Sequence, residues 1–304
     1  MKRQYILLTL LLTMLMSLAA QTGYQPLVRE GVRWICFDFA SNYEDGDEFQ
    51  IYSYEFIGDS ILYQNQFGTR FRYKRLYQKN LYSIHRDTNQ QLSNEDVAQS
   101  KPKLVSLMRE SGKKIYLPGF STSDESEWTF ENFATGFVLY DFSGTDAAIV
   151  GEYGMGEGHT YYNSFVFSNV VKIDGVDCRK YIYSTDNGVF AVIEGVGYAG
   201  SYGDLLRPNP DGGLPTCPCD FGLACLEDSD GKVLYKGSGY GLYMNFLRTI
   251  CDFTGDGRVD VSDLSAAIDV AVGKAENGKA DVNCDGRVDI ADVNTVVNVI
   301  LNAR

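Results

Sequence analysis

The stretch "FQIYSYEFIGDSILYQN", residues 49–65, sets a pattern that most of the chain repeats. Aromatic or branched side chains alternate with polar ones, and Gly58-Asp59 interrupts the alternation before it resumes. A period of two buries one face of a strand and exposes the other, which is typical of antiparallel sheets. The stretch therefore predicts two β-strands separated by a turn.

The same pattern continues on both sides, from about Tyr24 to about Tyr243. Three turn signals, Asp174-Gly175, Asn187-Gly188 and Asp230-Gly231, lie between apolar runs, where the positive φ of a tight hairpin favours this dipeptide. Further strands are expected in "TRFRYKRLYQKNLYSIHR", "GKKIYLPGF", "GFVLYDFSG", "SFVFSNVVKIDGVDCRKYIYS", "GVFAVIEGVG", "FGLACLED" and "GKVLYKG".

One short helix is expected among these strands, around "NEDVAQSKPKLVSLMRE" (residues 94–110), with Pro102 interrupting it. No helical stretch is long enough for a parallel crossover. The fold class expected for residues 21–236 is therefore mainly β, an antiparallel meander forming either a barrel or a sandwich.

The first twenty residues, "MKRQYILLTLLLTMLMSLAA", combine a basic start, an apolar run and small residues at Ala19 and Ala20. These are the three parts of a secretory signal peptide, so we expect cleavage after one of these alanines and a secreted, cell-surface or periplasmic protein. No later stretch is long and apolar enough to span a membrane. The formal charge of −13 becomes −15 when Lys2 and Arg3 leave with the leader, which argues against nucleic-acid partners.

Seven cysteines in a secreted chain suggest disulfides, and the odd count leaves at least one without an internal partner. The sequence favours a small loop from Cys217 or Cys219 to Cys225, with the other of the first two reaching Cys36 or Cys178. The spacing alone does not decide between these connectivities.

Catalytic residues cannot be named from the sequence. There are only two histidines, His85 and His159, and no Gly-x-Ser-x-Gly elbow, so a hydrolase triad has little support. Adjacent acids in "NYEDGDEF" are more typical of a solvated turn than of a catalytic pair. The many strand aromatics could stack on sugar rings, although most are expected in the core. We therefore interpret the β body as non-catalytic.

The end of the chain carries a different pattern, in which "DFTGDGRVDVSD" (residues 252–263) recurs as "DVNCDGRVDIAD" (residues 281–292). Calcium takes six to eight oxygen ligands, which a twelve-residue loop supplies from positions 1, 3, 5, 7, 9 and 12 around a glycine at position 6. In the first loop the ligand positions hold Asp252, Thr254, Asp256, Arg258, Asp260 and Asp263; in the second they hold Asp281, Asn283, Asp285, Arg287, Asp289 and Asp292. Arg258 and Arg287 would offer backbone carbonyls. Two calcium ions are predicted.

Apolar residues at helical spacing follow each loop, so each repeat is expected to be a loop and then a helix. The sequence suggests that the two helices pack only against each other. The glycine-rich residues 237–248 are expected to be a linker between the β body and this small domain at residues 249–304. Cys251 precedes the first loop and Cys284 lies at a variable position within the second, and their spacing does not demand a bridge.

Asp at position 12 and the offset of twenty-nine residues between EF-hand-like loops resemble a type I dockerin. The resemblance implies an all-α calcium-dependent domain that docks onto cohesin or a similar surface protein. Dockerins of cellulosomes usually carry hydroxyl residues at loop positions 10 and 11, whereas this chain has Val261, Ser262, Ile290 and Ala291. The variant is similar to tandem repeats that end many secreted Bacteroidetes proteins, and the β body resembles uncharacterised secreted proteins of the same bacteria.

The sequence thus predicts a secreted protein with a non-catalytic β body, possible glycan contacts, and a calcium-binding tail that mediates protein–protein docking. The alternative is a glycan-active enzyme for polysaccharide degradation, a glycoside hydrolase, carried by a dockerin.

Overall fold

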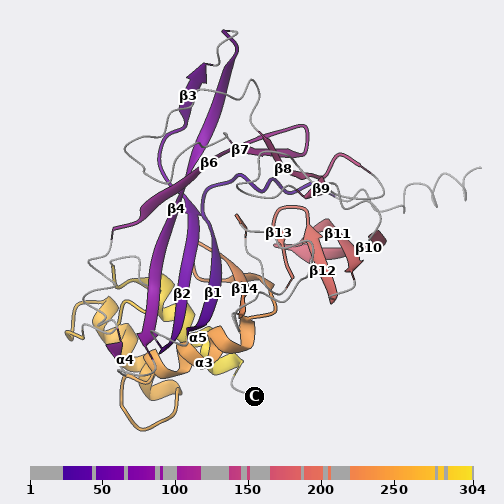
Figure 1. The fold of residues 1–304 in the computed structure, drawn as a ribbon. Helices are drawn as coiled ribbons and strands as arrows, with labels where there is room; N and C mark the ends of the chain where they lie inside the picture. Colours follow the sequence, from indigo (N-terminus) through magenta and orange to yellow (C-terminus); the bar gives the residue numbers. More distant parts are fainter. Residues whose placement is uncertain are drawn as a thin grey trace, which may run out of the picture.

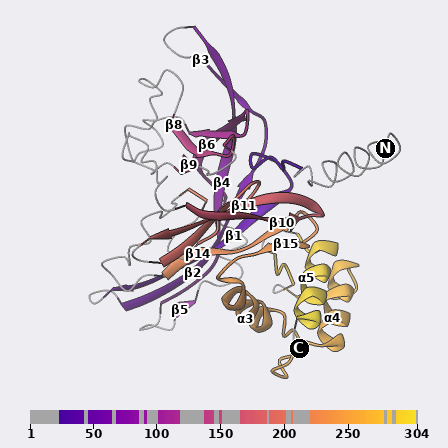
Figure 2. The ribbon, with the colours of Figure 1, turned by 90° about the vertical axis from the view of Figure 1, so that its right-hand side faces the viewer.

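A computed structural model describes residues 23–42, 46–64, 68–85, 90–91, 101–117, 137–144, 149–150, 165–185, 188–200, 205–206, 220–277, 280–283 and 287–302. Within these residues the chain is mainly β, and its strand pairs are antiparallel, as expected. A large sheet forms the middle of the molecule, with a small sheet on one face and three helices on the other (Figures 1 and 2).

The large sheet has the strand order β15-β14-β1-β2-β4-β6-β7-β8-β9, and β3 and β5 pair with β4 beside this path. Its strands are β1 (Val32–Asn42), β2 (Gly46–Phe56), β3 (Ile61–Gln64), β4 (Arg70–His85), β5 (Gln90–Gln91), β6 (Lys103–Ser111), β7 (Lys114–Leu117), β8 (Phe137–Asp141), β9 (Ile149–Val150), β14 (Asp220–Asp228) and β15 (Val233–Lys236). The stretch 49–65 does supply two strands, β2 and β3. Both pair with the long β4 rather than with each other, and Figure 1 shows β3 at the far end of β4 from the helices.

The small sheet has the order β10-β11-β12-β13. Its strands are β10 (Phe165–Ile173), β11 (Val176–Thr185), β12 (Gly188–Ile193) and β13 (Gly197–Tyr198). Asp174 and Gly175 join β10 to β11 with φ values of 49° and 78°. Two successive positive φ values define the tight turn that the sequence predicted here.

A first core lies between the two sheets. Trp34 on β1 is fully buried there, and its Nε1 donates to the carbonyl of Val196 over 2.8 Å. From the small sheet, the rings of Tyr183 and Phe190 stack with centroids 4.8 Å apart. Both sheets contribute large aromatic side chains to this core, so the two sheets pack face to face through it.

A second core lies on the opposite face of the large sheet, beneath the helices α3 (Tyr240–Ile250), α4 (Val261–Ala271) and α5 (Ile290–Leu301). Ile35 and Phe37 alternate along β1 with the residues of the first core and point into this second one. The expectation that α4 and α5 pack only against each other is therefore wrong. The central strands are apolar on both faces, and the helices cover the face that the small sheet leaves open.

The expected linker at 237–248 is also wrong, because α3 begins at Tyr240. The glycines of this segment allow its backbone to pack closely against the large sheet. A Cβ on Gly237 would lie 2.1 Å from the carbonyl oxygen of Leu223, and one on Gly239 would lie 2.1 Å from the ring of Phe37. Glycine here lets the backbone approach the sheet, which the sequence alone does not distinguish from flexibility.

The helix expected around 94–110 is not formed in its described part, because Lys103–Ser111 is strand β6. β6 pairs with the edge of β4 between Lys74 and Gln78, which satisfies its backbone in a sheet. Residues 94–100 lie outside the described residues.

Candidate metal centre

The first loop, residues 252–263, is folded around the carboxylate of Asp252. Its Oδ1 accepts hydrogen bonds from the backbone N–H groups of Gly255 (2.8 Å) and Asp256 (3.1 Å), and its Oδ2 accepts one from Gly257 (2.8 Å). Gly255 and Gly257 have φ values of 72° and 81°, which only glycine adopts readily. The glycine at position 6 thus makes the sharp turn that the sequence predicted.

Asp263, at position 12, joins the two ends of this loop. Its Oδ1 accepts from the backbone N–H and the hydroxyl of Thr254, at 3.0 and 3.1 Å, and its Oδ2 accepts from the N–H of Asp260 over 2.9 Å. Asp260 in turn accepts from Ser262 N–H and caps α4. Asp263 is completely buried, and within the described part of the chain no basic side chain forms an ion pair with it.

The second loop repeats this arrangement. Asn283 N–H donates to Asp292 Oδ1 over 3.2 Å, and Asp289 N–H donates to Asp292 Oδ2 over 2.8 Å. Asp289 caps α5 by accepting from Ala291 N–H, and Asp292 is also completely buried. The sequence repeat is therefore also a repeat of hydrogen bonds. Cys284, Asp285 and Gly286 of this loop lie outside the described residues.

Both position-12 carboxylates act on one buried thiol. Burial raises the pKa of Cys251 to about 12, and the charges of Asp263 and Asp292 push that pKa in the same direction. Two negative charges are thus held close to an apolar interior, an arrangement that a bound cation would relieve.

The donor set fits calcium, because the ligand positions present hard oxygen atoms only. A carboxylate has about four lone-pair sites, so the backbone hydrogen bonds at Asp252 and Asp263 leave acceptor capacity for an ion. Across the described ranges, however, no three acidic, cysteine or histidine side chains already converge to hold a metal. Ion binding would therefore need further side chains of the loop to turn toward the acceptor sites that these hydrogen bonds leave free.

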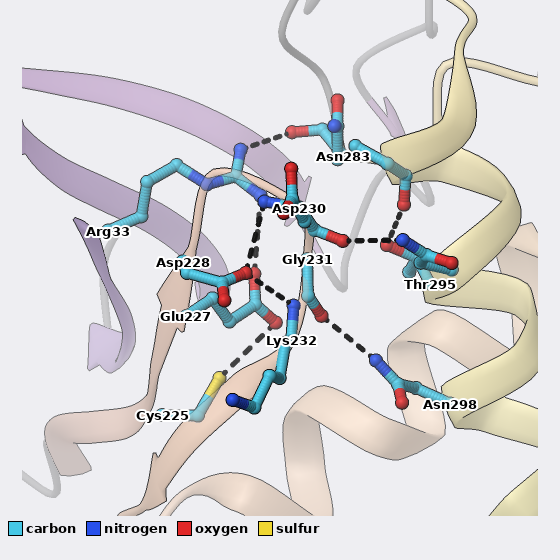
Figure 3. Close-up of polar contacts among 12 residues, drawn as sticks. Arg33, Cys225, Glu227, Asp228, Asp230, Gly231, Lys232, Asn283, Thr295 and Asn298 are labelled. Atoms are coloured by element: carbon cyan, nitrogen blue, oxygen red, sulfur yellow. Dashed lines mark hydrogen bonds and ion pairs between the residues drawn. The ribbon is translucent and has the colours of Figure 1, made fainter. Parts of the chain in front are cut away.

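The second loop rests on the large sheet through Arg33 of β1 (Figure 3). The Arg33 Nη1 donates to the backbone carbonyl of Asn283 over 2.8 Å, and its Nη2 lies 3.2 Å from Glu227 Oε2. Both charged side chains are buried. Glu227 lies directly opposite Arg33 in the register of β1 and β14, so the ion pair is part of the sheet. Sequence reasoning missed this contact, which spans 250 residues.

Glu227 also interacts with Cys225 on its own strand and with Tyr243 on α3. Burial raises the pKa of the Glu227 carboxyl, and this effect outweighs the opposing influence of Arg33 and of hydrogen bonds from Tyr243 and Cys225. The Sγ of Cys225 lies 3.6 Å from Glu227 Oε1. Burial, together with the Glu227 charge, raises the pKa of the Cys225 thiol well above its usual range, so the thiol stays protonated and donates.

These cysteines correct the disulfide prediction. Cys225 is a buried thiol, so the bridges predicted to it from Cys217 or Cys219 are not formed. Among the described residues, Cys36 and Cys178 form no disulfide either. The buried thiols fill core positions, a use of cysteine that spacing does not reveal. Cys217 and Cys219 themselves lie outside the described residues.

The turn between β14 and β15 binds α5. The side-chain amide of Asn294 donates to the carbonyl of Asp230 over 3.1 Å. The side-chain amide of Asn298 donates to the carbonyl of Gly231 over 2.9 Å (Figure 3). A Cβ on Gly231 would lie 3.0 Å from Thr295 Oγ1, so this glycine also permits a close approach. The helix that leaves the second loop is therefore fixed to the sheet along much of its length.

The rest of the β body offers a weaker candidate. Tyr52, Tyr54 and Tyr73 are buried in the core and do not form an exposed platform for sugar rings. A pocket of about 270 Å³ is lined by Gln50, Gln78, Asn80, Lys101 and Lys103, which include no carboxylate. The side chain of His85 lies outside the described residues, as does His159.

Comparison with protein-family models, with curated proteins and with solved structures finds no match to this chain. Among the described helices, none has the length and apolar character needed to cross a membrane.

Proposed function

We propose that this chain is a secreted protein whose two C-terminal loops bind two calcium ions and whose tail docks the protein onto a partner on the cell surface. The observation that carries the proposal is the repeated set of hydrogen bonds around Asp263 and Asp292. Two buried carboxylates in equivalent loops of hard oxygen donors fit a pair of divalent cations. The signal-like leader supports secretion, and extracellular calcium modules work at about 0.1–1 mM ion.

Docking is supported by the resemblance to dockerins, and the partner is a cohesin-like or another surface protein. Loop position 10 is apolar in both repeats, and Val261 and Ile290 are about two-thirds exposed. Exposed apolar side chains at related positions suit a partner with an apolar contact surface. The β body is displayed by this tail as a non-catalytic module.

A second candidate function is glycan binding by the β body. The amides and lysines around the pocket between β2, β4 and β6 are suited to hydrogen-bonding sugar hydroxyl or carboxylate groups. The lining residues supply no acid pair for hydrolysis. Affinity electrophoresis in gels containing acidic or neutral polysaccharides tests this candidate, and Lys101→Ala with Lys103→Ala should abolish any retardation.

Calorimetric titration of the mature full chain with calcium after chelation tests the metal sites. We expect two ions to bind. Asp252→Asn with Asp256→Asn should remove one ion and Asp281→Asn with Asp285→Asn the other, because asparagine keeps the shape of the loop and removes its charge. Asp269→Asn on α4 is the matched control, since Asp269 lies outside both loops and should leave two ions bound. If calcium gives no binding heat and no change in melting temperature, the calcium proposal is wrong.

A further inference from the structure

The strand pair of β3 and β4 carries a charge opposite to that of the whole molecule. The formal net charge of the chain is −13. Residues 60–85 nevertheless contain no acid and hold five basic residues, Arg70, Arg72, Lys74, Arg75 and Lys79. β3 pairs with the first part of β4 at the end of the molecule opposite the helices (Figures 1 and 2). An acidic protein thus has a basic arm at one end, formed by residues 61–64 and 70–75.

One face of this arm is exposed and cationic. Gln64 lies opposite Arg70 in the strand register, and Leu62 lies opposite Arg72. Opposite residues of an antiparallel pair share a face, as do residues two apart along a strand, so the four side chains lie together. All four are exposed. Arg70 Nε donates to Gln64 Oε1 over 3.1 Å, and within the described chain neither Arg70 nor Arg72 forms an ion pair.

The other face of the arm is fixed to the rest of the large sheet. Tyr73 is buried on that face, and the guanidinium of Arg109 on β6 lies 4.5 Å from the ring centre of Phe71. The same guanidinium lies 3.7 Å from the ring centre of Tyr116 on β7. These cation–π contacts connect β4 to β6 and β7. The exposed cations therefore stand on a fixed surface, and little order has to be gained when a ligand binds them.

Two neighbouring guanidinium groups suit an extended chain of anions. Alternate residues of a strand lie about 6–7 Å apart, so Arg70 and Arg72 can contact successive acidic groups of a linear polymer. A guanidinium bonds a planar anion such as a carboxylate through two parallel N–H donors, and it also binds other oxyanions. The Gln64 amide can hydrogen-bond hydroxyl groups. A membrane surface would favour a larger apolar patch, whereas Leu62 is the only exposed large apolar side chain among those described on the arm.

We infer that the β3–β4 arm binds a linear acidic polysaccharide, with Arg70 and Arg72 contacting its carboxylate or sulfate groups. Lys74, farther along the same face, is already paired with Glu30, so the two arginines supply the open charge. None of the described residues that line the pocket between β2, β4 and β6 belongs to the arm, so this is a second site. Binding here needs no calcium and is independent of the proposed docking of the tail.

The test measures the fluorescence anisotropy of labelled polysaccharides mixed with the mature full chain in chelator. Oligogalacturonate supplies carboxylates, dextran sulfate supplies sulfates, and neutral dextran supplies neither. We expect binding of an acidic probe that weakens as salt rises, and no binding of neutral dextran. Arg70→Gln with Arg72→Gln should weaken binding at least about tenfold, because charge-assisted hydrogen bonds are lost.

Matched variants separate recognition from net charge and from damage to the fold. Arg248→Gln with Lys274→Gln removes the same charge at the helix end of the molecule and should leave the affinity within about twofold. Arg70→Lys with Arg72→Lys keeps the charge but loses both forks, so it should weaken binding partially. Folding is checked in a Trp128→Phe background, where Trp34 is the only tryptophan and reports on the sheet. If the double glutamine variant misfolds, Arg72→Gln alone replaces it.

Several results would overturn the inference. These are no binding of either acidic probe, binding that ignores the folded arm variants, and binding lost in Lys101→Ala with Lys103→Ala but kept in the arm variants, which would place the ligand in the pocket. Tighter binding to vesicles of anionic phospholipid than to either acidic probe would make the arm a membrane contact instead. A chain that binds acidic polysaccharide but no calcium would overturn only the proposed calcium sites, and the reverse result would overturn only the site on the arm.

Discussion

Replacing Leu247 by alanine should destabilise the sheet as well as the helix that carries it. Leu247 lies on α3 with only 2% of its surface exposed, in the core that α3 shares with β1 and β14. Removing a buried leucine side chain costs about 2–5 kcal/mol, depending on how far the site can collapse. We expect about 3 kcal/mol, because the sheet on one side and α5 on the other limit collapse.

For a chain of this size, that loss lowers the melting temperature by about 6–12 °C. The assay is thermal unfolding of the Trp128→Phe chain, followed by far-UV circular dichroism for the helices and by Trp34 fluorescence for the sheet. Both signals should shift together. Leu242→Ala is the matched control on the same helix, and because Leu242 is 45% exposed its loss should cost under about 1 kcal/mol. If the helix signal shifts and the Trp34 transition does not, the tail and the sheet are separate units and the shared-core reasoning fails.

Three further outcomes are expected. Gly239→Ala at the N-cap of α3 should destabilise the chain by about 2 kcal/mol or more, because the new Cβ would meet the Phe37 ring. Gly241→Ala inside α3 would place its Cβ where nothing lies within 4 Å, so it should stabilise the chain slightly. Equal chemical-denaturation midpoints for the two variants would contradict this. Because the pKa of the buried Glu227 carboxyl is raised in the folded state, its contribution to the free energy of unfolding is fully present below the ordinary glutamate pKa and is lost as pH rises through the pKa of the folded state. Glu227→Gln should therefore flatten the fall in stability above about pH 4, measured by urea unfolding in chelator. An unchanged dependence of stability on pH would refute this. Cys178 and Cys225 should resist alkylation in the native chain and react in denaturant, because both thiols are buried with raised pKa values; peptide mapping that finds either in a disulfide would count against the structure.

Local patterns explain what the sequence predicts well. Strand alternation is local, as in β2, and so is the turn chemistry of Asp174-Gly175. The loop positions of Asp252, Gly257 and Asp263 are also local, because the backbone N–H groups that bond to the two carboxylates lie only a few residues away in the sequence. Such features depend on a few neighbouring residues, so one sequence is enough to infer them.

Long-range packing explains what the sequence does not predict. Nothing local indicates that β1 pairs with β14, or that Arg33 would bond to Asn283. One signal was available, because "RWICF" at residues 33–37 is a nearly continuous apolar run rather than an alternating one. Such a run indicates a strand buried on both faces, which requires a covering layer on each side. The glycines at the start of α3 are typical of a linker, so the sequence does not indicate that helices supply one of these layers.

The central place of β1 bears on when this protein can fold. β1 is the first of the described strands, and its neighbour on one side, β14, begins only at Asp220. A chain that is synthesised from its N-terminus therefore keeps one edge of β1 unpaired until β14 has been made, and one face of β1 uncovered until the helices α3, α4 and α5 follow. Contacts of such long sequence separation form slowly. Because β14 and the helices that cover β1 all lie beyond residue 219, the centre of the large sheet is completed only after most of its other strands have been synthesised.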